Sequence, residues 1–536
     1  MTKPPAGASD QNPAFSLMKI HATTNTTFRR IILAVISLLA AGALLLAMQE
    51  FLGSALGTPV LAQPDATTRY VAPTGSDPSN TCANSSTPCK TVQHAVDEAQ
   101  PGDEVRVATG VYTGVQARAG ITQVVYISKT VTVRGGYAST NWATSYPITQ
   151  PTTLDARGLG RVLVITGAIT PTVEGLRITG GDAAGLGGGH FEERDAGGGI
   201  YVVNGKPAFK NNWVFSNTTE WYGGGIFLFN SAAELRGNTI TTNTADWGGG
   251  LHLAADSGAM LSDNAISANT ATAGGGLAID SSAAVLGNNV IKANTADWGG
   301  GLMISGPSRI ATVDGNTIIS NTAKHGGGGL YVNSSSPVLR RNTILSNTAS
   351  HPNSTGGGLF IAQSSPVLIN NLIARNSTGN KGSGLYIDDS SPHLLHTTIA
   401  DNTGGDGSGI HVVDTNGPCV VVLTNTILAS QMLGIYATSN NTVTLEGTLW
   451  HDNSSDTGGA GAILTGTINI HDDPAFVNPA AGDYHLSSDS LAIDAGVDAG
   501  VNTDIDGDPR LWPFDIGADE HAALCIHLPI ALRVFP

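Results

Sequence analysis

The sequence predicts an all-β protein in which short strands wind into coils stacked along one axis. Two repeated signatures and the composition lead to this prediction. The first signature, a run of small residues (usually Gly) followed by Ile or Leu, returns every 25 to 29 residues. The second is Asn-x-Ile-x-x-Asn, as in Asn238/Ile240/Asn243. Charged residues make up 13% of the chain and hydrophobic residues 41%, enough for a core. The apolar residue of the first signature falls at Ile200, Ile226, Leu251, Leu277, Leu302, Leu330, Leu359, Leu385, Ile410 and Ile435.

The length of the repeat selects the architecture. Leucine-rich repeats have a similar length, but their spaced Leu pattern and helical periodicity are missing, and propeller blades need about 40 residues or more. Apolar runs such as Leu330-Tyr-Val, Pro337-Val-Leu and Thr343-Ile-Leu span only a few residues and alternate with Gly, Asn and Ser. We therefore expect a parallel β-helix with three strands in each coil of about 25–26 residues, from residue 101 to residue 471.

Stacked coils place equivalent residues on top of one another. Ile and Leu columns would then fill the core, and Asn columns at the turns would bond amide to amide along the axis. Because every coil repeats these Asn residues, we expect a structural ladder and no ligand site. Looser copies of the second signature are Asn212/Val214/Asn217, Thr397/Ile399/Asn402 and Asn425/Ile427/Ser430.

The first 62 residues have the features of an export signal. Arg29 and Arg30 precede an apolar run over residues 31–48, and Val60-Leu61-Ala62 offers small residues for cleavage before Gln63. The run lies far upstream of that site, so a signal peptide and an uncleaved membrane anchor both stay open. Either alternative predicts an extracellular protein, secreted or attached to the cell surface.

Residues 63–100 are expected to form an N-terminal cap with a disulfide loop and a helix. Cys82 and Cys89 bracket a short loop that a disulfide would close in an oxidising compartment. A zinc site there lacks ligands, since only His94 lies nearby. The segment from Thr91 to Ala99 has helical periodicity and would cover the first coil. Whether Cys419 and Cys525 are paired stays open.

The repeat stops near Asp472, where Pro, Asp and aromatic residues become frequent. Residues 472–521 would form a C-terminal cap or anchor-type module, since open ends of a coil stack recruit other strands unless covered. Residues 522–536 form a short apolar tail.

Several segments resemble known families. Tyr70-Val-Ala-Pro-Thr-Gly-Ser76 and Pro101-Gly-Asp-Glu-Val-Arg-Val-Ala-Thr-Gly-Val-Tyr112 resemble the opening segment of the pectate-lyase-like superfamily, which implies a right-handed parallel β-helix. Ala492-Ile-Asp-Ala-Gly496, Asp504-Ile-Asp-Gly-Asp-Pro-Arg510 and Asp515-Ile-Gly-Ala-Asp-Glu520 resemble the choice-of-anchor module of bacterial surface proteins. The two resemblances imply a fold and a surface location.

The sequence favours a non-catalytic role, structural and adhesive or glycan-binding. A formal net charge of −16 excludes nucleic acid and anionic lipid as partners, and membrane contact is expected only through an anchor at either end of the chain. Many members of the superfamily that the chain resembles cut polyuronides, so a polysaccharide lyase or glycoside hydrolase is the alternative. The polygalacturonase motifs are incomplete here, and we assign no catalytic residue. Extracellular or cell-envelope polysaccharide is the expected partner.

The candidate glycan site is a repeated pair of an acid and a Trp ahead of a Gly run. The repeats would stack as a broken aromatic column beside an acidic one, and large exposed aromatic side chains often mark binding surfaces. The alternative is a column that only covers the turn. The pairs are Glu220 with Trp221, Asp246 with Trp247, and Asp297 with Trp298.

Calcium is the one cofactor that the sequence suggests. Asp504, Asp506 and Asp508 surround Gly507 in a spacing that partly matches calcium loops, although the terminal Glu of such loops is missing. The alternative is a turn formed by Asp and Gly residues.

Overall fold

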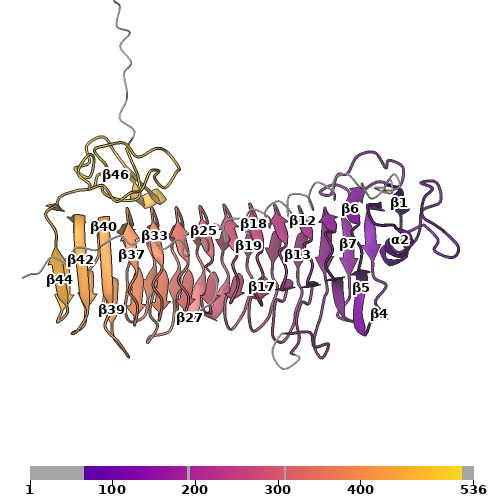
Figure 1. Cartoon of the computed structure of the whole chain (residues 1–536), viewed down its shortest axis with the longest axis horizontal. Helices are drawn as coiled ribbons and strands as arrows, with labels where there is room; N and C mark the ends of the chain where they lie inside the picture. The colour runs from indigo at the N-terminus through magenta and orange to yellow at the C-terminus, as the bar shows by residue number, and fades with distance from the viewer. Residues whose placement is uncertain (1–65, 190–193, 307–309, 522–536) are drawn as a thin grey trace, which may run out of the picture. The chain divides into compact units, whose positions relative to one another are not determined.

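The computed structural model describes residues 66–189, 194–306 and 310–521. These residues form a parallel β-solenoid with almost no helix, made of a 27-stranded sheet A, a 14-stranded sheet B and two small sheets (Figure 1). The fold class predicted from the repeats is confirmed. The predicted export signal, the predicted apolar tail and Cys525 lie outside the described residues. In the part of the chain that is described, no helix has the length and apolar character needed to span a membrane.

Sheet B forms one side of every coil. Its strands are parallel except for the antiparallel pair β4 and β5. They are β4 (Gln116–Arg118), β5 (Ile121–Ile127), β8 (Arg161–Thr166), β11 (Ile200–Val203), β14 (Ile226–Phe229), β17 (Leu251–Ala254), β20 (Leu277–Asp280), β24 (Leu302–Ser305), β28 (Leu330–Asn333), β32 (Leu359–Ala362), β36 (Leu385–Asp388), β39 (Ser408–Val413), β41 (Leu433–Ala437) and β43 (Ser455–Gly459).

Sheet A supplies the other two strands of each coil, as two parallel series. The first series is β1 (Thr68–Val71), β2 (Glu104–Ala108), β6 (Thr132–Tyr137), β9 (Thr172–Glu174), β12 (Ala208–Lys210), β15 (Glu234–Arg236), β18 (Met260–Ser262), β21 (Val285–Gly287), β25 (Thr312–Asp314), β29 (Val338–Arg340), β33 (Val367–Ile369) and β37 (His393–Leu395). The second series is β3 (Gly110–Tyr112), β7 (Thr152–Asp155), β10 (Leu176–Thr179), β13 (Trp213–Phe215), β16 (Thr239–Thr241), β19 (Ala265–Ser267), β22 (Val290–Lys292), β26 (Thr317–Ile319), β30 (Thr343–Leu345), β34 (Leu372–Ala374) and β38 (Thr398–Ala400).

The two series merge at the C-terminal end of the stack. The strands β40 (Val420–Ala429) and β42 (Thr442–His451) run through both series, and β44 (Ala462–Thr465) and β45 (Asn469–His471) end them. Four coils carry an additional short strand. These strands are β23 (Thr295–Trp298), β27 (Thr322–Gly326), β31 (Thr348–Ala349) and β35 (Ser377–Thr378).

The register of sheet B confirms the first signature. Ile200 pairs with Ile226, Ile226 with Leu251, and the column continues through all ten predicted residues to Ile435. All ten are fully buried in one core cluster. The preceding Gly residues are needed for the turn: Gly223 has φ +63°, and a Cβ there would lie 2.3 Å from the carbonyl oxygen of Ile226.

The predicted Asn ladders are also confirmed. Asn238, for example, donates from Nδ2 to Oδ1 of Asn264 at 2.9 Å and to the carbonyl oxygen of Phe209 at 2.9 Å, while its own Oδ1 accepts from Asn212. Such bonds satisfy buried polar groups at every turn. One ladder comprises Asn212, Asn238, Asn264, Asn289, Asn316, Asn342 and Asn371, and the other Asn217, Asn243, Asn269, Asn294, Asn321, Asn347, Asn376 and Asn402.

The structure shows that the last loose copy of the second signature, Asn425/Ile427/Ser430, is out of register by one residue. Ile399 pairs with Leu428, and Ile427 pairs with Thr398, so Ile427 points away from the core. The shift arises because the continuous strand β40 has no turn between its two halves. Gln431 then takes the place of the ladder Asn, donating to the carbonyl oxygen of Ile399 at 3.3 Å.

The N-terminal end of the stack is covered by the helix α2 (Val92–Glu98), as the sequence predicts. Thr91 caps this helix by accepting a hydrogen bond from the backbone N–H of His94, and Val92, Ala95 and Val96 join the core. A disulfide joins Cys82 and Cys89 in the preceding loop.

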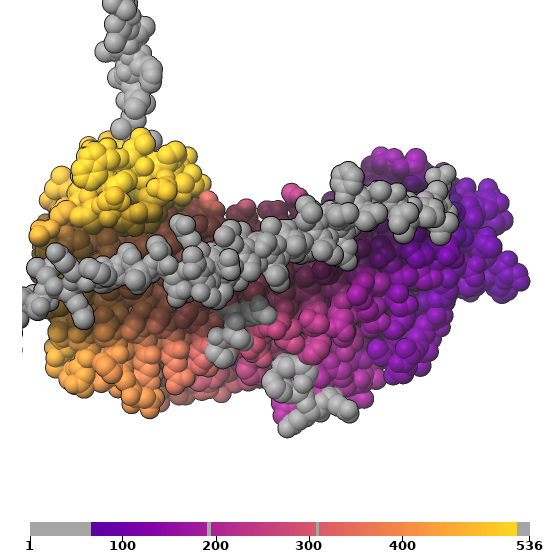
Figure 2. Space-filling model, in the orientation of Figure 1, coloured from indigo at the N-terminus to yellow at the C-terminus, as the bar shows by residue number. Residues whose placement is uncertain are grey.

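Residues 472–521, here called the C-terminal module, pack against the side of the coils, with contacts that reach Ile468 and Ile470 of the last one. The module contains β46 (Phe476–Asn478), the 3-10 turn η1 (Pro479–Ala481) and β47 (Asp483–Leu486), and Figure 2 shows it as a raised body on the stack. Its position follows from the outward residues of the second series, which become apolar here. The packed residues are Leu372, Ala374, Ala400, Ile427, Ala429 and Leu449 from the coils, with Tyr484, Leu486, Ala492 and Ile516 from the module.

Candidate functional site

A row of uncharged side chains leads along the outside of the coils to the C-terminal module. It consists of the first residue in each of six neighbouring second-series strands, and its members pair in register. We call this row the lateral strip, and its members are Trp213, Thr239, Ala265, Val290, Thr317 and Thr343. Side chains alternate between the two faces of a strand, so the neighbouring Ile240 and Ile266 point into the core while the strip faces outward.

Trp213 marks the N-terminal end of the lateral strip. Its side chain is 39% exposed, whereas most large aromatic residues of the coils are buried or half-buried. The guanidinium of Arg177 lies over the indole at 5.1 Å, and the ring of Phe215 lies 4.7 Å away. These neighbours hold the indole in place on the surface.

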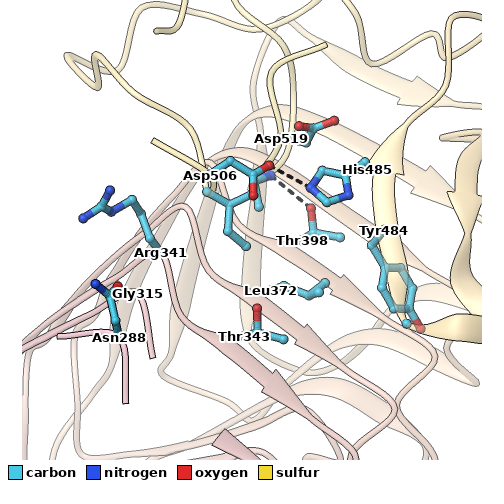
Figure 3. Close-up of a pocket in the computed structure, with 13 residues that line it drawn as sticks. Asn288, Gly315, Arg341, Thr343, Leu372, Thr398, Tyr484, His485, Asp506 and Asp519 are labelled. Atoms are coloured by element: carbon cyan, nitrogen blue, oxygen red, sulfur yellow. Dashed lines mark hydrogen bonds and ion pairs between the residues drawn. The ribbon is translucent and has the colours of Figure 1, made fainter. Parts of the chain in front are cut away.

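A cavity of about 310 Å³ lies at the other end of the strip, where the coils meet the C-terminal module. Thr343 and the two residues that continue its column, Leu372 and Thr398, form the floor (Figure 3). The module contributes the remaining wall, including Tyr484, His485, Asp506 and Asp519.

His485 is the central charged group of this cavity. Its Nδ1 lies 2.5 Å from Oδ1 of Asp483, and its Nε2 lies 2.8 Å from Oδ2 of Asp506 (Figure 3 draws the second contact). Burial alone would lower the pKa of His485, but the hydrogen bonds to Asp483 and Asp506 and the charge of Asp519 raise it to about 9. The imidazole is therefore protonated at neutral pH.

Asp519 is the most buried acid of the cavity. Burial raises the pKa of its carboxyl group, although the hydrogen bond that Oδ2 accepts from the backbone N–H of Leu486 at 2.7 Å works in the opposite direction. Arg341, on the opposite wall, donates to Oδ1 of Asp314 at 2.8 Å. The cavity thus holds acids of different burial beside one imidazole.

Of the three acids that the sequence suggests for calcium, the structure brings only Asp506 to this cavity. Asp504 is buried, and its Oδ1 accepts the backbone N–H groups of Asp506, Gly507 and Asp508 at 2.8–3.0 Å. That geometry is typical of an Asp-stabilised turn and uses the oxygen that a cation would need. Calcium at these three residues stays a prediction, with the turn alternative favoured.

Two groups in the described part of the chain have the geometry to hold a metal ion. One is Cys82, Cys89 and His94, but its two sulfur atoms are already bonded to each other. The other is His485, Asp506 and Asp519, which sequence analysis missed. These residues come from three separate segments of the module, so no local spacing could have revealed them.

The structure corrects the alignment of the predicted Trp column. Trp247 pairs with Tyr222 and not with Trp221, and the column continues through Ala273 to Trp298. The reason is local: Tyr222 stands between Trp221 and the Gly run, so Trp221 lies one residue outside the column.

The three Trp side chains are half-buried, and their rings contact other aromatic or cationic groups. Trp298 lies 5.4 Å from Tyr331 and 6.1 Å from Phe360, and Trp247 lies 6.3 Å from His252. Trp221 is covered by the guanidinium of Arg194 at 3.9 Å. This packing favours the structural alternative for the column.

The acids beside these Trp residues vary in surroundings. Glu220 is exposed, whereas Asp246 and Asp297 are half-buried. Oδ1 of Asp246 accepts a hydrogen bond from Thr272 at 3.2 Å. The acidic side chains lie at the same turn of successive coils, beside the indoles.

Comparison with known proteins identifies the family. Residues 173–344 and 301–449 match the model of the right-handed β-helix region, and the two matches together span just over half of the chain. The chain belongs to this family. The C-terminal module lies outside the matched residues.

Solved structures match the chain at low sequence identity and with low TM-scores. Pectate lyase Pel9A is 14% identical, with a TM-score of 0.36, and the match covers 85% of this chain and 96% of that one. The GH136 lacto-N-biosidase from Eubacterium ramulus is 10% identical, with a TM-score of 0.32 and coverage of 76% and 68%. No curated protein sequence matches the chain.

Proposed function

We propose that this chain is an extracellular β-helix scaffold that binds a neutral polysaccharide along the lateral strip. The observation that carries the proposal is the strip itself, six uncharged outward residues in register that begin at the exposed Trp213. Successive strands lie about 4.8 Å apart, a repeat comparable to the length of one sugar unit. An extended chain of sugars can therefore meet an equivalent contact on each coil.

The chemistry of the strip supports a neutral ligand. The protein carries a formal net charge of −16, which disfavours polyanions. Thr hydroxyl groups can exchange hydrogen bonds with sugar hydroxyls, and an exposed indole offers an apolar face for stacking. The role is adhesive or structural, as the sequence favours.

The test is retention of the secreted protein on a panel of neutral and acidic polysaccharides, by affinity electrophoresis. We expect retention by a neutral polysaccharide that is weakened by Trp213→Ala. Trp221→Ala is the matched control, because it removes one of the three indoles of the glycan site that the sequence suggests, and this indole lies outside the lateral strip. Retention that is lost in Trp221→Ala and kept in Trp213→Ala would place the site at Trp221 and reject the lateral strip.

A polysaccharide-active enzyme is the second candidate. It is favoured by the carboxyl groups of Asp506 and Asp519 facing the cavity at the end of the strip. Paired carboxyl groups of different burial can serve as acid and base in glycoside hydrolysis. Incubation with the same panel, followed by assays for reducing ends and unsaturated products, tests this candidate, and absence of both products from every polysaccharide that is retained contradicts it.

A further inference from the structure

We infer that His485, Asp506 and Asp519 form a binding site for a divalent transition-metal ion of the zinc type. One potential ligand atom from each residue lies within 4.8 Å of the other two. Ligand atoms around one zinc ion each lie about 2.0–2.2 Å from it. Figure 3 shows the three groups side by side at the cavity, where rotation of their side chains would bring them to one ion.

The groups around these ligands hold them in the required orientation. Nδ1 of His485 faces Oδ1 of Asp483 at 2.5 Å, which leaves Nε2 directed at Asp506. A carboxylate that binds the second ring nitrogen is the usual partner of a metal-ligating His. Asp519 is fixed in the same way, because its Oδ2 accepts the backbone N–H of Leu486 at 2.7 Å and its other oxygen stays available.

Charge also favours a divalent cation. The two carboxylates supply two negative charges, and the cation would replace the proton on Nε2 of His485. The nearby Arg341 is directed to Asp314, at 2.8 Å. Imidazole nitrogen and carboxylate oxygen are both zinc ligands, whereas calcium takes six to eight oxygen atoms. The set therefore differs in chemistry from the calcium loop that the sequence suggests.

The metal would face the cavity of about 310 Å³. Three protein ligands leave a coordination position open on that side, where water or a solute can bind. This inference goes beyond the proposed function, and it does not depend on polysaccharide binding.

The experiment is a titration of the chelator-treated secreted protein with Zn²⁺ by isothermal calorimetry, without any glycan. We expect one high-affinity ion in the wild type and loss of that ion in His485→Gln. Asp506→Asn is a second variant, and it does not disturb packing because Asp506 is exposed. Asp508→Asn is the control: it removes the same charge from the neighbouring exposed acid, and we expect its affinity to stay within about threefold, since Asp508 lies outside the ligand set.

A second readout uses Co²⁺, whose visible absorption depends on its ligands. The wild type should give a Co²⁺ spectrum that disappears in His485→Gln, and Asp483→Asn should weaken Zn²⁺ affinity by about 10- to 100-fold through loss of orientation. The inference is overturned if Zn²⁺ does not bind, if it binds His485→Gln and the wild type equally, or if the Asp508→Asn control loses the ion as Asp506→Asn does.

Discussion

Arg510 of the C-terminal module donates a hydrogen bond from Nη2 to Oδ1 of Asn370, a coil residue 140 positions earlier in the chain, at 3.0 Å. Asn370 in turn donates from Nδ2 to the carbonyl oxygen of Thr503 at 2.5 Å. The Arg510 side chain is fully buried and also pairs with Glu520 at 2.9 Å. One guanidinium therefore organises the inside of the module and attaches it to the coils.

Replacing Arg510 should loosen the module. Arg510→Gln leaves the buried carboxylate of Glu520 without its cation, and breaking a buried pair in this way costs about 3–5 kcal/mol. We expect the module to become sensitive to limited proteolysis while the coils stay resistant. The double variant Arg510→Gln/Glu520→Gln should recover part of the resistance, and equal sensitivity of single and double variants would contradict the role of the ion pair.

The Asn ladders should contribute strongly to stability. Asn294 accepts hydrogen bonds from the backbone N–H and Nδ2 of Asn269 and donates to Asn321 and to the carbonyl oxygen of Ile266. Asn294→Ala leaves these buried groups unsatisfied, so we expect the free energy of unfolding in urea to fall by about 2–4 kcal/mol. Asn353→Ala, at an exposed position, is the control and should have little effect. Equal losses in the two variants would argue against a special role for the ladder.

His396 should make the packing of the module depend on pH. This side chain is buried under the module, its Nε2 lies 3.0 Å from Nδ2 of Asn425, and burial together with the charge of Arg510 lowers its pKa from 6.5 to about 3. A pKa that is lower in the folded state means that stability is complete above pH 6.5 and is lost as pH falls toward 3. By linkage the loss is about 2 kcal/mol at pH 5.

The measurement compares the wild type with His396→Asn at pH 7 and pH 5. Asp515, whose pKa burial raises to about 6, acts in the opposite direction in both proteins, so the difference between them isolates His396. Between pH 7 and pH 5, we expect the free energy of unfolding to fall by about 2 kcal/mol more in the wild type than in His396→Asn. Parallel pH profiles for the two proteins would show that His396 does not titrate as its burial implies.

Polysaccharide affinity should depend on Trp213 and not on Trp221. Loss of one stacking aromatic group costs about 0.5–1.5 kcal/mol, so Trp213→Ala should weaken the affinity by about 2- to 13-fold. Thermal unfolding midpoints of both variants show whether each remains folded. If Trp213→Ala and the wild type bind the same polysaccharide with equal affinity, binding along the lateral strip is contradicted.

The coil stack could be predicted from the sequence because equivalent residues recur and contact one another. The column from Ile200 to Ile435 and both Asn ladders follow from single positions repeated in each unit. Register failed where the repeat is irregular: Tyr222 displaces Trp221, and the turnless strand β40 displaces Ile427.

The candidate site could not be predicted, because its parts come from segments without a shared period. Thr343 belongs to the coils, while His485 and Asp519 belong to different loops and strands of the module. Their approach depends on the apolar patch around Leu372 and Ile427, which holds the module against the side of the stack. A pattern in one segment carries no information about such a contact.

Because the module packs against the side of the coils, the number of coils that precede it in the chain can change. Duplication of one whole unit between β13 and β30 would add a rung of about 4.8 Å to the distance from Trp213 to the cavity and would leave both ends as they are. Under the proposed function, such a duplication would lengthen the lateral strip by one residue and allow it to contact one more sugar unit.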